Sequence, residues 1–163
     1  PVDAALKGLE IAKSAGIQTV LNPAPATDLP EELLSLCDYI TPNETETEAL
    51  TGISVSTVSE AQKAADELHK MGVKTPIITL GEQGAFLHGY GLITSFKTAP
   101  VVETTGAGDA FNGGFAAALS EGQTPLKAVT LGCATAGISV TRAGTAPSMP
   151  SRSEVEKVLA TQR

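Results

Sequence analysis

Residues 104–111, "TTGAGDAF", place a carboxylate directly after three small residues. Gly106, Ala107 and Gly108 precede a long run of small and apolar residues, so Asp109 falls in the first turn of an expected helix. A first turn leaves backbone N–H groups unpaired and carries partial positive charge, which attracts anions. Residues with little or no side chain let phosphate oxygens approach those amides. The segment therefore predicts an anion site with a carboxylate beside it.

This arrangement suits phosphoryl transfer to an alcohol. The helix N-terminus favours the ionised form of Asp109, which can accept the proton of a hydroxyl while the amides stabilise charge on the phosphate. The structural alternative is a glycine-rich turn with a capping aspartate. Two rival phosphate motifs are excluded, because GxxxxGK[ST] occurs nowhere and a dinucleotide fingerprint needs glycine at position 111, which is Phe111.

Two further segments follow expected strand ends. Asn43 and Glu46, in "TPNETE", have the spacing of a capping box, and the same pair suits contact with a hydrated magnesium ion beside phosphates. Both roles are compatible. Residues 79–84, "TLGEQG", carry two glycines. They predict either a tight hairpin turn or backbone that a nucleotide approaches closely.

The elements that must position these segments alternate between helices and strands. Asp3 is expected to cap a first helix that Gly16 ends, and a second helix starts within residues 28–32. Further helices are expected at residues 43–50, 57–71, 107–120, 125–142 and 151–161. Gly52 is expected to end the first of these, and the Thr57 to Glu60 spacing predicts a capping box at the start of the second. Strands are expected at residues 17–22, 38–42 and 76–80, with an antiparallel extension at 84–89 and 91–96 on either side of Tyr90. The pattern predicts an α/β fold, with an open, three-layer, mostly parallel sheet and helices on both faces. Ligands of such sheets bind beyond the carboxyl ends of the strands.

Composition excludes several classes of function. The formal net charge is -7 at pH 7 and the eleven Lys and Arg residues are scattered, so we expect no nucleic-acid partner. No apolar run reaches the about eighteen residues of a membrane span, and the first residues lack a signal core. We therefore expect no membrane partner and a cytoplasmic location. The 163 residues suffice for one core.

Cysteine and histidine give little sign of chemistry. Cys37 and Cys133 match no metal or redox spacing and are expected to be buried, reduced thiols. His69 and His88 have no other ligand at a suitable spacing, so we expect neither a zinc site nor a histidine-centred mechanism. Because Pro1 already stands at the opening of a helix, we expect the chain to be part of a longer protein.

Five segments, in this order and spacing, resemble the ribokinase family of sugar and nucleoside kinases: "NPAPA" at 22–26, "TPNETE" at 41–46, "ITLGEQGA" at 78–85, "TTGAGDAFNGGF" at 104–115 and "SVTRAGTAPSMP" at 139–150. The resemblance covers most of the chain. It implies transfer of a phosphoryl group from ATP to the 5-hydroxyl of D-ribose. Fructose, adenosine or a modified nucleoside remain alternative acceptors.

The resemblance also implies roles for individual residues. Asp109 is the base that contacts the sugar hydroxyl, and the amides of Gly106, Ala107 and Gly108 form the anion hole. Asn43 and Glu46 lie beside the phosphates, and Glu46 binds magnesium indirectly, through water. The implied nucleotide pocket takes Thr79, Leu80, Gly81, Glu82, Gln83, Gly84, Gly108 and Cys133, the last where the family often has Asn or His. The implied potassium ligands are Glu103, in place of the usual Asp, with Thr105, Ser139, Arg142, Gly144 and Ser148.

Family members are roughly twice as long, which implies that residues 1–163 are the C-terminal, nucleotide-binding and catalytic-base half of a ribokinase-like domain. The sugar-gripping residues, the lid and the first strands are then absent from this chain. We expect the chain alone to be inactive and to expose apolar sheet surface, and the full-length protein to be a homodimer. A non-catalytic nucleotide-binding or oligomerisation module is the alternative from another class. A dehydrogenase is a third possibility, which lacks its fingerprint here.

Overall fold

The computed structural model describes residues 2–25 and 27–161. Residues 1, 26, 162 and 163 lie outside these ranges, and with them the last residue of the "NPAPA" segment. The chain forms two compact units, where its length predicted one core. The first contains residues 1–80 and 86–91, and the second contains residues 81–85 and 92–163.

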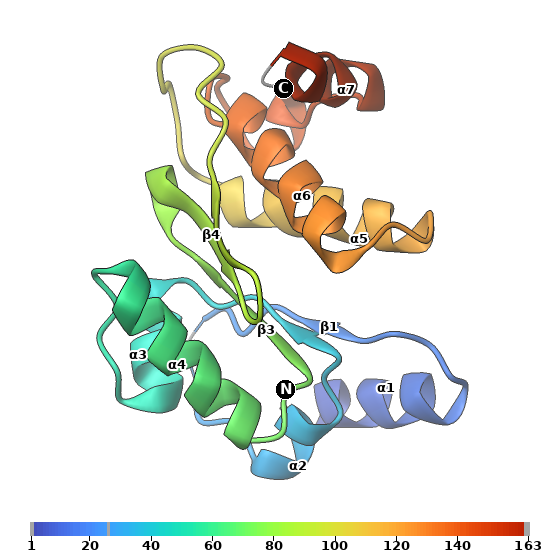
Figure 1. The fold of residues 1–163 in the computed structure, drawn as a ribbon. Helices are drawn as coiled ribbons and strands as arrows, with labels where there is room; N and C mark the ends of the chain where they lie inside the picture. Colours follow the sequence, from blue (N-terminus) through green and yellow to red (C-terminus); the bar gives the residue numbers. More distant parts are fainter. Residues whose placement is uncertain (1, 26, 162–163) are drawn as a thin grey trace. The chain divides into compact units, whose positions relative to one another are not determined.

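The first unit alternates strands with helices, as the sequence predicted. Its elements are α1 (Val2–Ser14), β1 (Val20–Leu21), α2 (Glu31–Ser35), β2 (Tyr39–Ile40), α3 (Glu44–Thr51), α4 (Val58–Lys70) and β3 (Thr75–Thr79) (Figure 1). Strands β1, β2 and β3 pair in parallel, with Val20 opposite Tyr39 and Tyr39 opposite Thr75. This confirms the predicted parallel sheet.

Two more strands extend the sheet. Strands β4 (Gly84–Leu87) and β5 (Gly91–Thr94) follow β3, and the hydrogen-bonded order is β1-β2-β3-β4-β5. Only three residues join β4 to β5, and so short a connection joins antiparallel neighbours. The predicted antiparallel extension around Tyr90 is therefore confirmed, and the sheet is mixed.

Helices α3 and α4 begin with the capping residues that the local sequence predicted. Asn43 caps α3 in a capping box with Glu46, and Thr57 caps α4 in the same way with Glu60. Each pair satisfies N–H groups that the first turn leaves unpaired. Gly52 ends α3 in the left-handed conformation that glycine adopts without steric cost.

Other boundaries differ from the prediction. Asp3 lies inside the first turn of α1 and is not its N-cap. The N-cap of α2 is Pro30, which has no side-chain cap bond, and α2 has only five residues. The strand expected at 17–22 pairs only at Val20–Leu21, because the amide of Ile17 donates to the carbonyl of Ala12 at the end of α1.

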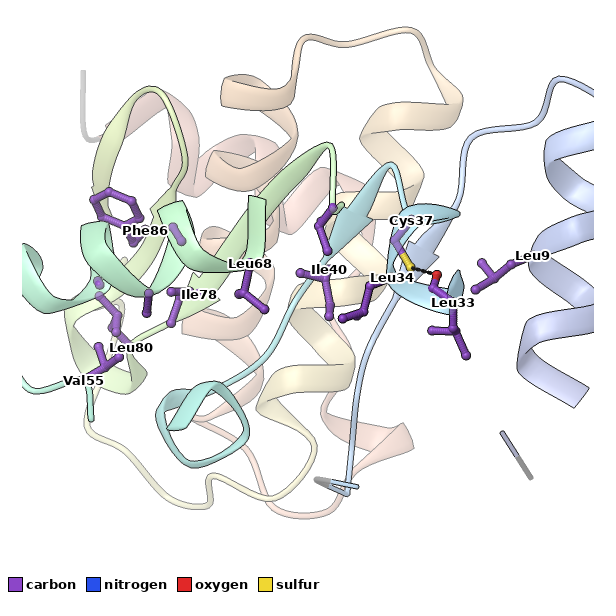
Figure 2. Packing of buried hydrophobic residues seen from close by; sticks show 14 residues of the cluster. Leu9, Leu33, Leu34, Cys37, Ile40, Val55, Leu68, Ile78, Leu80 and Phe86 are labelled. Carbon is purple, nitrogen blue, oxygen red and sulfur yellow. Dashed lines mark hydrogen bonds between the residues drawn. The ribbon is translucent and has the colours of Figure 1, made fainter. Parts of the chain in front are cut away.

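The hydrophobic core of the first unit lies between its helices and the parallel strands. Leu33, Leu34, Ile40 and Leu68 are fully buried, and Figure 2 shows them with the rest of the cluster. The Cys37 thiol donates to the carbonyl of Leu33 at 3.3 Å, and burial, followed by the charge of Asp38, raises its pKa to about 11. Cys37 is a free, buried thiol, as predicted.

One buried carboxylate ties α1, β1 and β2 together. Asp38 accepts hydrogen bonds from the Lys13 ammonium at 2.9 Å and from the Thr19 amide at 3.0 Å. Burial works to raise the pKa of Asp38, but these hydrogen bonds outweigh it, and the pKa lies below its usual value. The network fixes the strand that leads to Asn43.

The second unit is mainly helical. It contains a 3-10 turn at Gly81–Gln83, α5 (Ala107–Ser120), α6 (Pro125–Ser139), a second 3-10 turn at Ala146–Ser148 and α7 (Arg152–Thr161). Helices α5 and α6 lie side by side (Figure 1). A Cβ at Gly114 would lie 2.4 Å from the Thr135 hydroxyl, and one at Gly132 would lie 2.9 Å from the Phe111 ring. The close approach of the two helices therefore requires these glycines, and it holds the N-terminus of α5 in place.

Candidate active site

Asp109 is the third residue of α5 and is exposed to solvent. We call residues 104–108 the glycine loop. Gly106 is the N-cap of α5, with a left-handed φ of 82°, and no side chain caps the helix. Gly108 is exposed, and a Cβ placed on it would meet nothing within 4 Å. The carboxylate is therefore not enclosed by packed side chains, and the space above the first turn is open.

The amides of the first turn are only partly engaged. The Ala107 amide donates to the carbonyl of Thr104 at 3.1 Å. No hydrogen bond within the described residues uses the amides of Gly106, Gly108 or Asp109. The sequence predicted an anion hole of Gly106, Ala107 and Gly108. In this geometry the Ala107 amide is occupied by the chain itself, and the Asp109 amide is an open donor that the sequence analysis missed.

The glycine loop is held by the segment that follows α6, which we call the 140–148 segment. The carbonyl of Val140 accepts from the amides of Val102 at 2.8 Å and Glu103 at 3.1 Å, and the Gly144 amide donates to Glu103 Oε2 at 2.7 Å. Helix α6 ends at Ser139, three residues before the predicted end at residue 142. It ends there because the chain turns to meet residues 102–103.

The predicted potassium ligands offer a set of oxygen atoms. No hydrogen bond within the described residues uses the carbonyls of Thr105, Arg142 or Gly144. The Ser139 and Ser148 hydroxyls are buried and donate to the carbonyls of Ala136 and Thr145, which leaves lone pairs on each oxygen. Together with the Glu103 carboxylate, these carbonyl and hydroxyl oxygens are the kind of ligands that a hard cation prefers. The described residues contain no group of three His, Cys, Asp or Glu that could hold a metal.

Asn43 and Glu46 lie at the start of α3, in the first unit. Asn43 Oδ1 accepts from the Glu46 amide at 2.8 Å, and Glu46 Oε2 accepts from the Asn43 amide at 2.9 Å. The Glu46 residue is only 8% exposed. The capping role is confirmed, and the role beside magnesium stays a prediction.

Residues 79–84 form a turn, which is one of the two structures predicted for them. The amide and hydroxyl of Thr79 both donate to the carbonyl of Pro42, at 2.9 and 3.3 Å, and Leu80 is buried. Gly81, Glu82 and Gln83 form an exposed 3-10 turn. Gly84 has a φ of 117°, and a Cβ there would lie 2.0 Å from the carbonyl oxygen of Ile93. The fold therefore explains the glycine at position 84 without a ligand.

Cys133 lies on α6 and is 4% exposed. Its sulfur lies 4.0 Å from the carbonyl oxygen of Ile93, and burial raises the pKa of the thiol to about 12. The thiol is buried and free, as predicted. Its place near a nucleotide stays a prediction.

The structure also joins residues that the sequence analysis did not connect. The Arg142 guanidinium donates to the carboxylate of Glu154, on α7. The Ser151 to Glu154 spacing is a capping-box signal that marks the glutamate in sequence, but not its bond to Arg142. The rings of His69 and His88 lie 4.9 Å apart, although nothing in their spacing connected them.

The chain is similar to known carbohydrate kinases in sequence. The family model described as pfkB family carbohydrate kinase matches residues 1–152. The ribokinase of Haemophilus influenzae is 47% identical over 152 residues, which are 92% of this chain and 50% of that protein. The chain spans about half the length of the curated relatives it matches. No helix of the described residues is long and apolar enough to span a membrane.

Solved structures of ribokinases have the same fold as this chain. The structure of Arabidopsis thaliana ribokinase complexed with ribose and ATP matches 98% of this chain and 53% of its own, with a TM-score of 0.93 and 35% identity. The ribokinase of Thermotoga maritima matches 94% of this chain and 52% of its own, with a TM-score of 0.83 and 43% identity. The predicted fold class is confirmed.

Proposed function

Because this chain belongs to the pfkB family of carbohydrate kinases, we propose that it is the C-terminal, nucleotide-binding and catalytic-base half of a kinase that phosphorylates the 5-hydroxyl of D-ribose with ATP. The observation that carries the proposal is the exposed Asp109 in the first turn of α5, beside the Gly108 and Asp109 amides, which no hydrogen bond among the described residues uses. The similarity to ribokinases, one of them complexed with ribose and ATP, supports the substrate pair.

In the proposed reaction, Asp109 accepts the proton of the ribose 5-hydroxyl as that oxygen bonds to the γ-phosphorus of ATP. The bond from the γ-phosphorus to the bridging oxygen of ADP breaks, and the products are ribose 5-phosphate, ADP and a proton. The Gly108 and Asp109 amides, at the positive end of α5, stabilise charge on the phosphoryl oxygens. Such transfers depend mainly on positioning and electrostatic stabilisation, which a fixed helix N-terminus supplies.

Two cations belong to the proposal. Glu46, with Asn43, would hold the waters of a magnesium ion that neutralises phosphate charge when bound. Glu103, Ser139 and Ser148, with the carbonyls of Thr105, Arg142 and Gly144, would hold a potassium ion that adds positive charge beside the glycine loop. The half of the protein outside this chain would supply the sugar contacts, so we expect the chain alone not to phosphorylate ribose.

The test uses a chimera in which this chain replaces the matching half of the Haemophilus influenzae ribokinase. We expect Asp109→Asn to lower kcat by about 10²- to 10⁴-fold, the usual contribution of a general base, while ATP binding persists. The exposed Asp28, outside the site, provides the matched control Asp28→Asn, which should keep the parental rate.

Three outcomes would overturn or revise the proposal. Full activity of the Asp109→Asn chimera would remove the general-base role. Binding of ATP without phosphorylation of any acceptor by the parental chimera would favour a non-catalytic nucleotide-binding module. Faster turnover of fructose or adenosine than of ribose would reassign the substrate within the same family.

A further inference from the structure

Helix α7 reaches the 140–148 segment through one glutamate. Glu154 Oε1 accepts from the Arg142 guanidinium, and Oε2 accepts from the amide and the hydroxyl of Ser151, each at 2.8 Å. Both oxygens of the carboxylate are therefore engaged. The Ser151 amide, and then Arg142, lower the pKa of Glu154 to about 2, so the carboxylate is charged at any working pH.

From Arg142 the contacts continue to the glycine loop. The Arg142 amide donates to the carbonyl of Ser139 at 3.1 Å, and two residues later the Gly144 amide donates to Glu103 at 2.7 Å. The next residue, Thr145, has its Cβ 3.3 Å from where a Cβ on Gly106 would lie. The 140–148 segment thus contacts the residue just before the glycine loop and the N-cap of α5.

A second ion pair of α7 offers a comparison. Arg152 donates to both carboxylate oxygens of Glu121 at 2.8 Å, and Glu121 follows the C-terminal end of α5. This pair ties α7 to the end of α5 that is opposite Asp109. It resembles the Arg142–Glu154 pair in chemistry and exposure, but no hydrogen bond or ion pair within the described residues joins it to the 140–148 segment.

We propose that Glu154 is a positioning residue for the glycine loop and acts through the guanidinium of Arg142. Among the described residues, this pair is the only side-chain hydrogen bond between the 140–148 segment and α7. Without it, no side-chain hydrogen bond within the described residues joins α7 to the segment that contacts Glu103 and Gly106. The consequence for catalysis rests on the proposed function, because it requires the loop amides to receive the phosphoryl group.

The first test measures structure and needs no turnover. In the chimera, hydrogen exchange is followed at the amides of residues 103–109 and 140–148. Glu154→Gln keeps an acceptor for the Ser151 amide and removes the charge that holds Arg142. We expect the Gly144 amide to exchange about fivefold faster, as for loss of a half-exposed ion pair, and Glu121→Gln to leave it unchanged. Equal exchange in both variants would overturn the proposal.

The second test measures kinetics. We expect Glu154→Gln to lower kcat about fivefold with KM for ribose unchanged, and Glu121→Gln to leave both values as they are. If Glu154 acts through Arg142, the double variant Arg142→Gln/Glu154→Gln will be no slower than either single variant. Additive losses would refute action through Arg142. Failure of the proposed function would appear separately, as an active Asp109→Asn chimera, and would leave the exchange result intact.

Discussion

Two glycine-rich segments of the second unit differ in what their glycines do. In the turn at residues 81–84, Gly84 has a φ of 117°, and its missing Cβ leaves room for the backbone of residues 93–95. In the glycine loop, Gly106 has a φ of 82° and packs against Thr145, but Gly108 is helical and faces open space. The fold itself accounts for Gly84 and Gly106. It does not account for Gly108.

The difference separates glycines that the fold requires from Gly108, which has a role only in the proposed function. Alanine at the second position of a helix would stabilise it relative to glycine, and no atom of the protein stands in the way at position 108. The proposed function supplies a reason for the absence of a side chain there, because a phosphoryl group would approach the backbone at this position. Substitution by alanine at each position tests this distinction.

The largest effect is expected for Gly84→Ala. A Cβ there would lie 2.0 Å from the Ile93 oxygen and 2.7 Å from the Ser95 nitrogen, so the backbone must move. We expect a loss of about 3 kcal/mol or more in the free energy of unfolding, measured by urea denaturation. A loss below about 1 kcal/mol would show that the turn adapts and that the distinction fails at this position.

Gly106→Ala should have an intermediate effect. Its left-handed φ costs a residue with a Cβ about 1–2 kcal/mol, and the new Cβ would press on Thr145 at 3.3 Å. We expect this loss in the free energy of unfolding, with faster hydrogen exchange at Gly144. Unchanged stability would contradict the close contact between the loop and the 140–148 segment.

Gly108→Ala should change stability least and function most. We expect stability to stay the same or rise by up to about 1 kcal/mol, and kcat/KM for ATP in the chimera to fall about tenfold. Gly113, farther along α5, also faces open space and is the matched control. Gly113→Ala should gain similar stability at unchanged kcat/KM. Equal activity of the two variants would remove the special role of Gly108.

The sequence analysis was right for features that depend on residues close together in the chain. The capping boxes at Asn43 and Thr57 depend on neighbours three residues away, and both are confirmed. The predicted end of α6 was wrong by three residues, because contacts of Val140 with residues 102–103 determine where the helix ends. The occupied Ala107 amide and the Arg142–Glu154 pair were missed for a similar reason. Loop geometry and pairing between distant residues leave no periodic trace in the sequence.

The two buried cysteines give the molecule a built-in probe of its own motions. Cys37 belongs to one compact unit and Cys133 to the other, and each thiol reacts with an alkylating reagent only when its surroundings open. Timed alkylation with readout by mass spectrometry would therefore record the opening of each unit on a separate residue, with no engineered label.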